Sequence, residues 1–194
     1  PEPKESPRKA DDRVAGNSRA PFSPGGVVDA LFDARDPQWG VDVKVQRDTL
    51  KIGRDRLQFR LTSARAGYVY VIQVGTDARH FWQLFPNAKD RANRIEAGTE
   101  LVLPRASWPV EAGGPPGTNR LLALVTASPR DFSGAGLQAP DASTVIAEFD
   151  LARAESAWIA QGAAPFAGKP VNCALPAADC ERHGAVRFEV REIE

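Results

Sequence analysis

The chain of 194 residues contains no methionine, two cysteines and two histidines. It also has no apolar run of about 18 residues, which is the length that a membrane-spanning helix needs. We therefore expect no transmembrane segment in this part of the chain. Because the sequence starts at Pro1 and has no methionine, we expect a fragment or a processed product with a membrane anchor or another domain upstream.

An excess of charge of one sign is missing as well. Lysine plus arginine equals aspartate plus glutamate, 25 each, so the formal net charge is zero. Without a basic excess, no overall field attracts nucleic acid or an anionic membrane, and we predict no nucleic-acid partner. The apolar share of 42% and the charged share of 26% are typical of a globular protein, and the length suffices for one well-buried core.

The scarcity of histidine limits the catalytic sites that the chain can build. A Ser–His–acid or Cys–His site requires a histidine beside the nucleophile, and only His80 and His183 exist. His80 opens a predicted strand, where a half-exposed structural side chain is the common case, and His183 lies in a polar loop, where we expect a solvated side chain. We therefore predict no catalytic residue and no cofactor. The alternative, a cell-envelope hydrolase, would need a pocket that gathers one of these histidines with a carboxylate.

The two cysteines lie close together in the sequence VNCALPAADCERH. Six residues separate Cys173 from Cys180, and a disulfide can close such a loop, so we predict that they are bonded in an oxidising compartment. One alternative is that the cysteines are two unbonded thiols. The other is a metal site formed with His183, but such a site would lack a fourth ligand and the short C-x-x-C spacing. We predict no metal site. Four aspartates lack the spacing of a 12-residue calcium loop and are predicted to be solvated: Asp29, Asp33, Asp36 and Asp42.

The pattern along the chain predicts an all-β fold behind a linker. Residues 1–26 carry five prolines and few large apolar residues, so we expect a disordered or extended linker followed by a single domain over 27–194. Helical spacing of apolar residues predicts a short helix after Val27 and another over 151–162, with Leu151, Ala154, Trp158 and Ile159 on its apolar face. Alternating or continuous apolar runs predict strands at 41–45, 49–52, 57–61, 68–74, 80–85, 99–104, 120–125, 144–149 and 185–193.

Short strands with turn signals every eight to twelve residues are typical of an antiparallel β-sandwich, here with one or two peripheral helices. The run at 68–74 is apolar on both faces, which predicts a central strand covered on both sides. In LFPNAKDRANRIEAGTELVLP, we predict turns rather than an active-site loop. Asn87 satisfies backbone groups of its own turn, Ile95 returns to the core, and Gly98 has a positive φ.

Several motifs in the middle of the chain resemble those of a bacterial domain family of unknown function. This family is often appended to Ser/Thr protein kinases, to caspase-like peptidases and to other envelope or signalling proteins. The resemblance covers residues from about 55 to 134. Its motifs are LFPN at 84–87, N-x-I-x-AG at 93–98, LP at 103–104 and PPG at 115–117 before RLLALV. It carries no catalytic residues over to this chain.

The resemblance implies a non-catalytic binding or sensor module. Its expected setting is the extracytoplasmic or periplasmic part of a membrane-tethered Ser/Thr kinase, or a protein associated with a secretion system such as type VI. The expected partner is a protein or a cell-envelope component. Trp39 and Trp108 lie in predicted connections, where an aromatic residue either covers the core or anchors a partner. We therefore name Trp39, Trp108, Asn87 and Arg94 as the candidate partner surface. A structural envelope protein that self-associates through a sheet edge is a further alternative.

Overall fold

The structure, a computed structural model, describes residues 20–140 and 144–194. The linker was predicted over residues 1–26. Residues 1–19 of it lie outside the described residues, so the prediction for them is not tested. None of the helices in the described part is long and apolar enough to cross a membrane.

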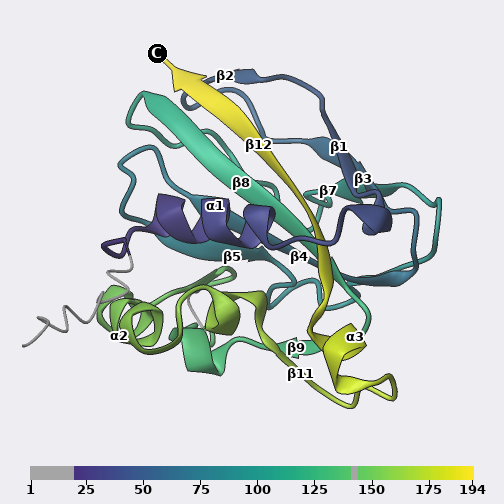
Figure 1. The fold of residues 1–194 in the computed structure, drawn as a ribbon. Coiled ribbons are helices and arrows are strands. Elements are labelled where there is room, and N and C mark those ends of the chain that lie inside the picture. The colour runs from purple at the N-terminus through teal and green to yellow at the C-terminus, as the bar shows by residue number, and fades with distance from the viewer. Residues whose placement is uncertain (1–19, 141–143) are drawn as a thin grey trace, which may run out of the picture.

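A seven-stranded mixed sheet forms the centre of the molecule (Figure 1). The strand order is β10-β5-β4-β8-β12-β2, and the short β6 also pairs with β4. All pairs are antiparallel except β12 with β2. The strands are β2 (Thr49–Lys51), β4 (Gly67–Val74), β5 (Phe81–Phe85), β6 (Arg94–Ile95), β8 (Gly117–Thr126), β10 (Ala147–Glu148) and β12 (His183–Ile193).

Strand β4 lies inside this sheet and is covered on both faces. Val69 and Val71 belong to one core cluster, whereas Tyr70 and Ile72 belong to a second cluster on the other face. The prediction of a central strand from the continuous apolar run is therefore confirmed. Each cluster has its own covering layer, which defines a small-sheet face and a helical face of the seven-stranded sheet.

The small-sheet face is covered by a three-stranded antiparallel sheet in the order β1-β3-β7. Its strands are β1 (Asp42–Val45), β3 (Phe59–Thr62) and β7 (Leu101–Leu103). Two packed sheets with helices at the outside correspond to the predicted β-sandwich-like class, which is confirmed.

The helical face is covered by α1 (Pro24–Asp33), α2 (Leu151–Gln161) and the 3₁₀ turn η3 (Ala164–Ala167). In Figure 1, α1 crosses over the sheet and α2 lies below it. Helix α1 begins inside the predicted linker, because Ser23 Oγ accepts a hydrogen bond from Gly26 N at 3.0 Å and proline follows at the first helical position. Phe22 also packs against the core of this face.

Helix α2 lies where the sequence predicts it, but with a narrower buried stripe than expected. Ala154, Ala157 and Trp158 are buried, whereas Leu151 and Ile159 are 42% and 69% exposed. The prediction that Leu151 and Ile159 face the core is therefore wrong. The small side chains of Ala154 and Ala157 let the helix backbone approach the sheet closely. The side of the helix that carries Trp158 therefore faces the sheet.

A disulfide joins Cys173 to Cys180, whose Cα atoms are 6.0 Å apart. The guanidinium of Arg130, 7% exposed, donates to the carbonyl oxygens of Gly168 at 2.9 Å, of Arg182 at 3.1 Å and of Cys180. These bonds hold the bridged segment against the two-stranded β9-β11 pair. The elements here are β9 (Arg130–Asp131), β11 (Lys169–Pro170) and α3 (Ala177–Glu181), and the remaining 3₁₀ turns are η1 (Pro37–Trp39) and η2 (Ser133–Ala135).

The predicted turn chemistry after β5 is confirmed. Asn87 Nδ2 donates to Leu84 O at 2.9 Å, and Asn87 Oδ1 accepts from the backbone N–H groups of Lys89 and Asp90, each at 3.0 Å. Ile95 is 4% exposed and belongs to the core of the small-sheet face. Gly98 has a φ of 71°.

Candidate binding cavities

Three of the four side chains named as the candidate partner surface are buried. Trp39 and Trp108 are each 4% exposed and Asn87 is 5% exposed. Arg94 is exposed, and its Nε lies 3.3 Å from Glu96 Oε1. Arg94 is the exposed member of this set, and Asn87 lines a cavity that is described below.

Both tryptophans cover the core of the small-sheet face. Trp108 stacks on Phe85 at 5.9 Å between ring centroids, and its indole Nε1–H donates to Asp90 Oδ2 at 2.8 Å. Trp39 packs directly against Gly184, where an added Cβ would lie 2.3 Å from that of Trp39. The covering role that the sequence suggested for both residues therefore holds, and the anchoring role does not.

His183 is 5% exposed, so the prediction of a solvated side chain is wrong. Its Nε2–H donates to the Leu31 carbonyl oxygen at 2.9 Å, which joins the start of β12 to α1. Burial lowers the pKa of His183 below its ordinary value of 6.5, and the nearby charge of Arg130 lowers it further. His183 is a neutral structural residue of the helical face.

His80 has a half-exposed side chain next to β5, as the sequence predicts, but it has a carboxylate partner. Its Nδ1 lies 2.5 Å from Asp77 Oδ2, and its ring stacks on Trp82 at 5.0 Å. The backbone N–H groups of Arg79 and His80 hold the pKa of Asp77 down at about 2, and burial opposes this slightly. Asp77 is therefore ionised at neutral pH.

Within 20–140 and 144–194, no group of three or more His, Cys, Asp or Glu side chains is arranged to hold a metal ion. Asp29, for example, lies 2.6 Å from Arg120 and 2.5 Å from Arg187 across two strands.

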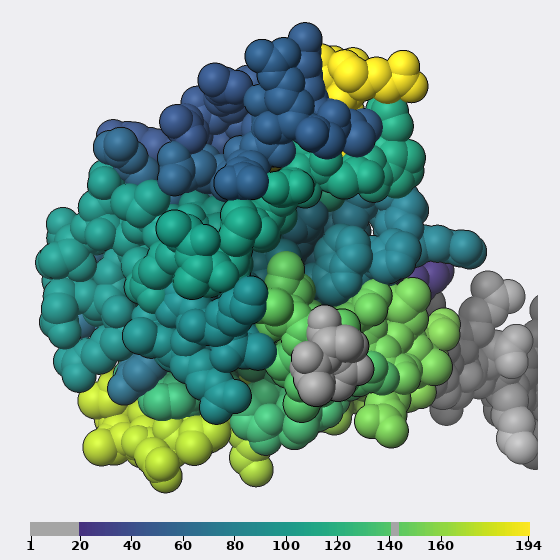
Figure 2. Space-filling view, turned by 180° about the vertical axis from the view of Figure 1, so that it is seen from behind, coloured from purple at the N-terminus to yellow at the C-terminus, as the bar shows by residue number. Residues whose placement is uncertain are grey.

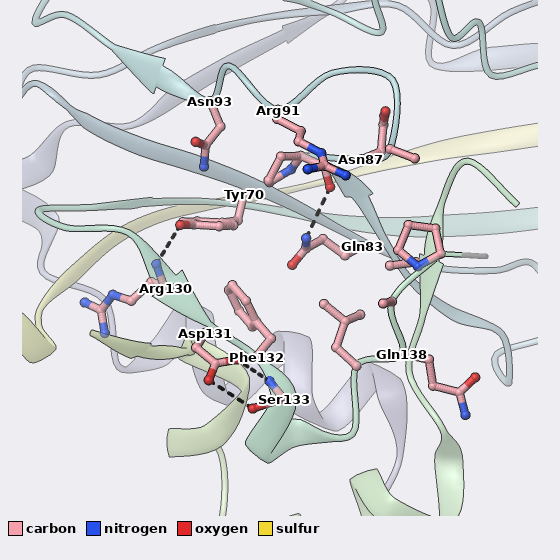
Figure 3. A pocket seen from close by; sticks show the side chains of 16 residues that line it. Tyr70, Gln83, Asn87, Arg91, Asn93, Arg130, Asp131, Phe132, Ser133 and Gln138 are labelled. Atoms are coloured by element: carbon pink, nitrogen blue, oxygen red, sulfur yellow. Dashed lines mark hydrogen bonds between the residues drawn. The ribbon is translucent and has the colours of Figure 1, made fainter. Parts of the chain in front are cut away.

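A cavity of about 490 Å³ opens on the helical face, beside the end of β5 and the β9 segment (Figure 3). We call it the amide cavity, because four of its lining side chains are Asn or Gln. It is lined by Tyr70, Gln83, Pro86, Asn87, Ala88, Arg91, Asn93, Arg130, Asp131, Phe132, Ser133, Leu137, Gln138, Ala139, Pro140 and Ala147.

Gln83 and Arg91 have unused hydrogen-bonding capacity in the amide cavity. Gln83 is 6% exposed, and its Nε2 donates to Pro86 O at 3.2 Å, as the dashed line in Figure 3 shows. Its Oε1 is buried and has no hydrogen-bond partner among the described residues. Arg91 lies on the rim, and no carboxylate of the described residues forms an ion pair with it.

Tyr70 and Asp131 in this cavity are engaged in hydrogen bonds, whereas Arg130 Nε is buried and has no hydrogen-bond partner among the described residues. The Tyr70 hydroxyl accepts from Arg130 N at 2.7 Å, and burial raises the pKa of Tyr70. Asp131 accepts from the N–H and the hydroxyl of Ser133 at 2.8 and 3.0 Å, which lowers the pKa of Asp131. These contacts fix the walls, and Gln83 and Arg91 remain available to a ligand.

A second cavity, of about 330 Å³, lies on the small-sheet face near the β4-β5 turn. We call it the acidic cavity, because Asp77, Glu111 and Glu192 are its charged carboxylates and no lysine or arginine lines it. It is lined by Gln73, Gly75, Thr76, Asp77, His80, Trp82, Leu84, Val110, Glu111, Gly113, Gly114, Pro115, Asn119, Ile146 and Glu192.

Sequence reasoning missed Gln83 in the amide cavity and Gln73 in the acidic cavity. Gln73 and Gln83 each interrupt an apolar strand, and both are more than nine-tenths buried. A buried amide needs hydrogen-bond partners. A glutamine inside an otherwise apolar run was therefore the available signal, and our sequence interpretation did not use it.

The fold and the two cavities define a β-sandwich-like domain with a helical layer. Residues 49–129 match the model of a family described as Domain of unknown function (DUF4384). This match agrees with the resemblance seen in the sequence and extends from β2 to just beyond β8. Comparisons with curated proteins and with solved structures found no match.

Proposed function

We propose that this domain is a non-catalytic binding module and that the amide cavity is its binding site for a carboxylate-bearing peptide segment. The observation that carries the proposal is a cavity of about 490 Å³ lined by the buried amide oxygen of Gln83 and by the Arg91 guanidinium, neither of which has a partner among the described residues. Ligand sites of roughly 300–1,000 Å³ with a few placed polar groups are common.

The chemistry of the lining favours a peptide. Side-chain amides carry both donors and acceptors, and the peptide backbone needs both. Gln83 Oε1 can accept one backbone N–H, while Asn93 and Gln138 lie on the same cavity. Tyr70, Phe132 and Leu137 supply apolar and aromatic contact area.

Arg91 selects the charge of the ligand. A guanidinium presents two parallel N–H groups to a carboxylate, and such bidentate pairs are short and specific. The only carboxylate in the lining is that of Asp131, which is bonded to Ser133. A C-terminal carboxylate or an acidic side chain of a partner can therefore pair with Arg91.

The setting that we propose is extracytoplasmic, in a membrane-tethered Ser/Thr kinase or in a protein associated with a secretion system. The disulfide between Cys173 and Cys180 supports an oxidising compartment. The resemblance to a family found beside kinases supports the signalling context.

A binding selection tests the proposal. Two acetylated peptide libraries of the same random sequences, one with free C-terminal carboxylates and one with amides, are passed over the immobilised domain. We expect enrichment of the carboxylate library and at least tenfold weaker binding of the enriched peptides to the Arg91→Ala variant. Arg94→Ala is the matched control, because Arg94 is exposed nearby but does not line the cavity. Equal enrichment of both libraries would assign the carboxylate to an acidic side chain of the peptide, and unchanged affinity in Arg91→Ala would contradict the proposal.

A hydrolase is the second candidate, because the acidic cavity gathers His80 with the carboxylate of Asp77. Such a pair can act as a general base. The only side-chain hydroxyl in the lining belongs to Thr76, so the pair would activate a water molecule. Turnover of chromogenic esters or of cell-wall fragments that disappears in His80→Ala would favour the hydrolase over the binding module.

A further inference from the structure

The acidic cavity lies on the opposite face of the seven-stranded sheet from the amide cavity. Leu84 and Trp82 in its wall belong to the core of the small-sheet face, whereas Tyr70 and Phe132 of the amide cavity belong to the helical face. Figure 2 shows the molecule from behind, and a hollow opens near the centre of this view, between teal and blue-teal segments and the green segment that precedes α2. Residues from five separate parts of the chain meet in this cavity.

A directed chain of hydrogen bonds forms the floor of the cavity. Gln73 Nε2 donates to Asn119 Oδ1 at 2.8 Å, and Asn119 Nδ2 donates to Glu192 Oε1 at 2.6 Å. Gly114 N–H donates to Glu192 Oε2 at 2.7 Å. All donors point toward Glu192, and at the other end of the chain of hydrogen bonds Gln73 Oε1 is an acceptor with no donor among the described residues.

Glu192 is a buried negative charge without a counter-ion. It is 8% exposed, and no lysine, arginine or histidine of residues 20–140 and 144–194 lies within ion-pair distance of it. The hydrogen bonds to its two oxygens offset part of the desolvation cost, but an unpaired buried charge remains unfavourable. A cation that enters the cavity would gain from this field.

The other two carboxylates extend the negative field to the rim. Asp77 is ionised at neutral pH because two backbone N–H groups bind it. Glu111 lies on the rim and pairs with the exposed Arg56 at 2.7 Å. A positively charged group therefore meets acidic residues on the way in as well as at the floor.

Aromatic and aliphatic side chains form the walls. The stacked rings of His80 and Trp82 present an aromatic surface, which attracts cations through the ring quadrupole. Leu84, Val110 and Ile146 supply apolar contacts, against which methylene groups can pack while a charged end reaches the polar floor.

We propose that the acidic cavity binds an alkyl chain that ends in a primary ammonium group, as in a lysine side chain of a partner or in a free aliphatic diamine. The ammonium group donates to Gln73 Oε1 and lies in the field of Glu192, and the methylene groups pack against the apolar walls. This site does not depend on the proposed function of the amide cavity, so Arg91→Ala should leave it unchanged.

Site-specific NMR titration tests this inference on the intact domain. The probes are Nα-acetyl-lysine amide, 1,5-diaminopentane and the uncharged Nα-acetyl-norleucine amide, and the signals are the Gly114 amide and the Trp82 indole. We expect saturable shifts with an ammonium probe and at least tenfold weaker binding of the norleucine amide. Of the two ammonium probes, the one that binds more tightly identifies the source as a peptide side chain or as a free diamine.

Glu192→Gln removes the charge with little change in shape and should weaken ammonium binding at least tenfold. Glu189→Gln is the matched control, because it makes the same charge change on the same strand at an exposed position outside the cavity. Unchanged affinity in a folded Glu192→Gln variant would overturn the proposal, and so would equal binding of the lysine and norleucine amides. The absence of any shift at about 10 mM ammonium probe would also overturn it, because this concentration detects even millimolar affinities. If Glu192→Gln does not fold, the lysine-to-norleucine ratio in the unmodified protein decides alone.

Discussion

The two faces of the central sheet are built from different parts of the chain. Most of the small-sheet face comes from residues 49–129, the segment that matches the family model. The helical face takes its cover from outside that segment, from α1, α2 and η3. Without these elements, the apolar residues of β4 and β8 on that face would be exposed, and a sheet with a bare apolar face is not stable in water. In this protein, the family segment is therefore one half of a larger folding unit.

The two cavities also differ, because charged residues of opposite sign line them. The amide cavity on the helical face offers Arg91 and the acidic cavity on the small-sheet face offers Glu192, and neither residue has an ion-pair partner in the described part of the chain. Ligands of opposite charge are thus expected on opposite sides of one sheet. Four predictions test how far the two faces are equivalent and how tightly they are coupled.

The largest effect should follow from truncation of one core residue on each face. Phe166 on the helical face is fully buried and packs near Phe81, Phe149 and Trp158, so Phe166→Ala should cost about 3–5 kcal/mol. Ile95→Ala on the small-sheet face should cost about 2–5 kcal/mol. Chemical denaturation followed by tryptophan fluorescence and by circular dichroism should show a single transition in both variants. Two separate transitions in Phe166→Ala would mean that the faces unfold independently.

Loss of the disulfide should have the next largest effect and should be confined to the helical face. Replacing Cys173 and Cys180 with serine opens a loop with a sequence separation of 7 and should cost about 2–3 kcal/mol in the chain-entropy model. The unfolding midpoint with and without reductant measures this in the unmodified protein, and Leu175→Ala at an exposed loop position is the control. A midpoint that reductant does not change would argue against the bond or its role.

Removal of the Asn87 side chain should weaken the turn after β5. Asn87→Ala leaves the Leu84 carbonyl and two backbone N–H groups without their partner, and the expected cost is about 1–3 kcal/mol. Arg94→Ala, at an exposed position in the same loop, should stay within about 0.5 kcal/mol. The thermal midpoints of the two variants measure the difference, and equal midpoints would argue against a structural role for the Asn87 side chain.

The smallest effect should come from His183 on the helical face. Its pKa in the folded protein lies below the ordinary value of 6.5, so the unfolded chain binds the proton more readily. The stability from neutral His183 is complete above about pH 6.5 and declines as the pH falls below that value, at no more than about 1.4 kcal/mol per pH unit. Unfolding free energies at several pH values should decline less steeply in His183→Gln. An equally steep decline in both proteins would assign the pH dependence to other groups.

Much of the fold could be predicted from local patterns, and the cavities could not. Alternation placed most strands within a few residues, and the continuous apolar run at 68–74 marked the strand with two buried faces. The asparagine and glycine of the turn segment behaved as their conformational preferences predict. For Trp39 and Trp108 the sequence left a cover of the core and a partner anchor as alternatives, because their burial depends on distant neighbours such as Gly184 and Asp90.

The sequence by itself determined the β-rich class, the central strand, the turn chemistry and the pairing of the two cysteines, because each follows from residues that are near one another in the chain. Only the tertiary structure decided which side of α2 is buried, that His183 is neutral and enclosed, and that His80 shares a cavity with Glu192. Gln73, Asn119 and Glu192 lie far apart in the sequence and become neighbours when β4, β8 and β12 pair. A site assembled by long-range strand pairing leaves only isolated polar residues in the sequence, and its charge and shape arise when the strands come together.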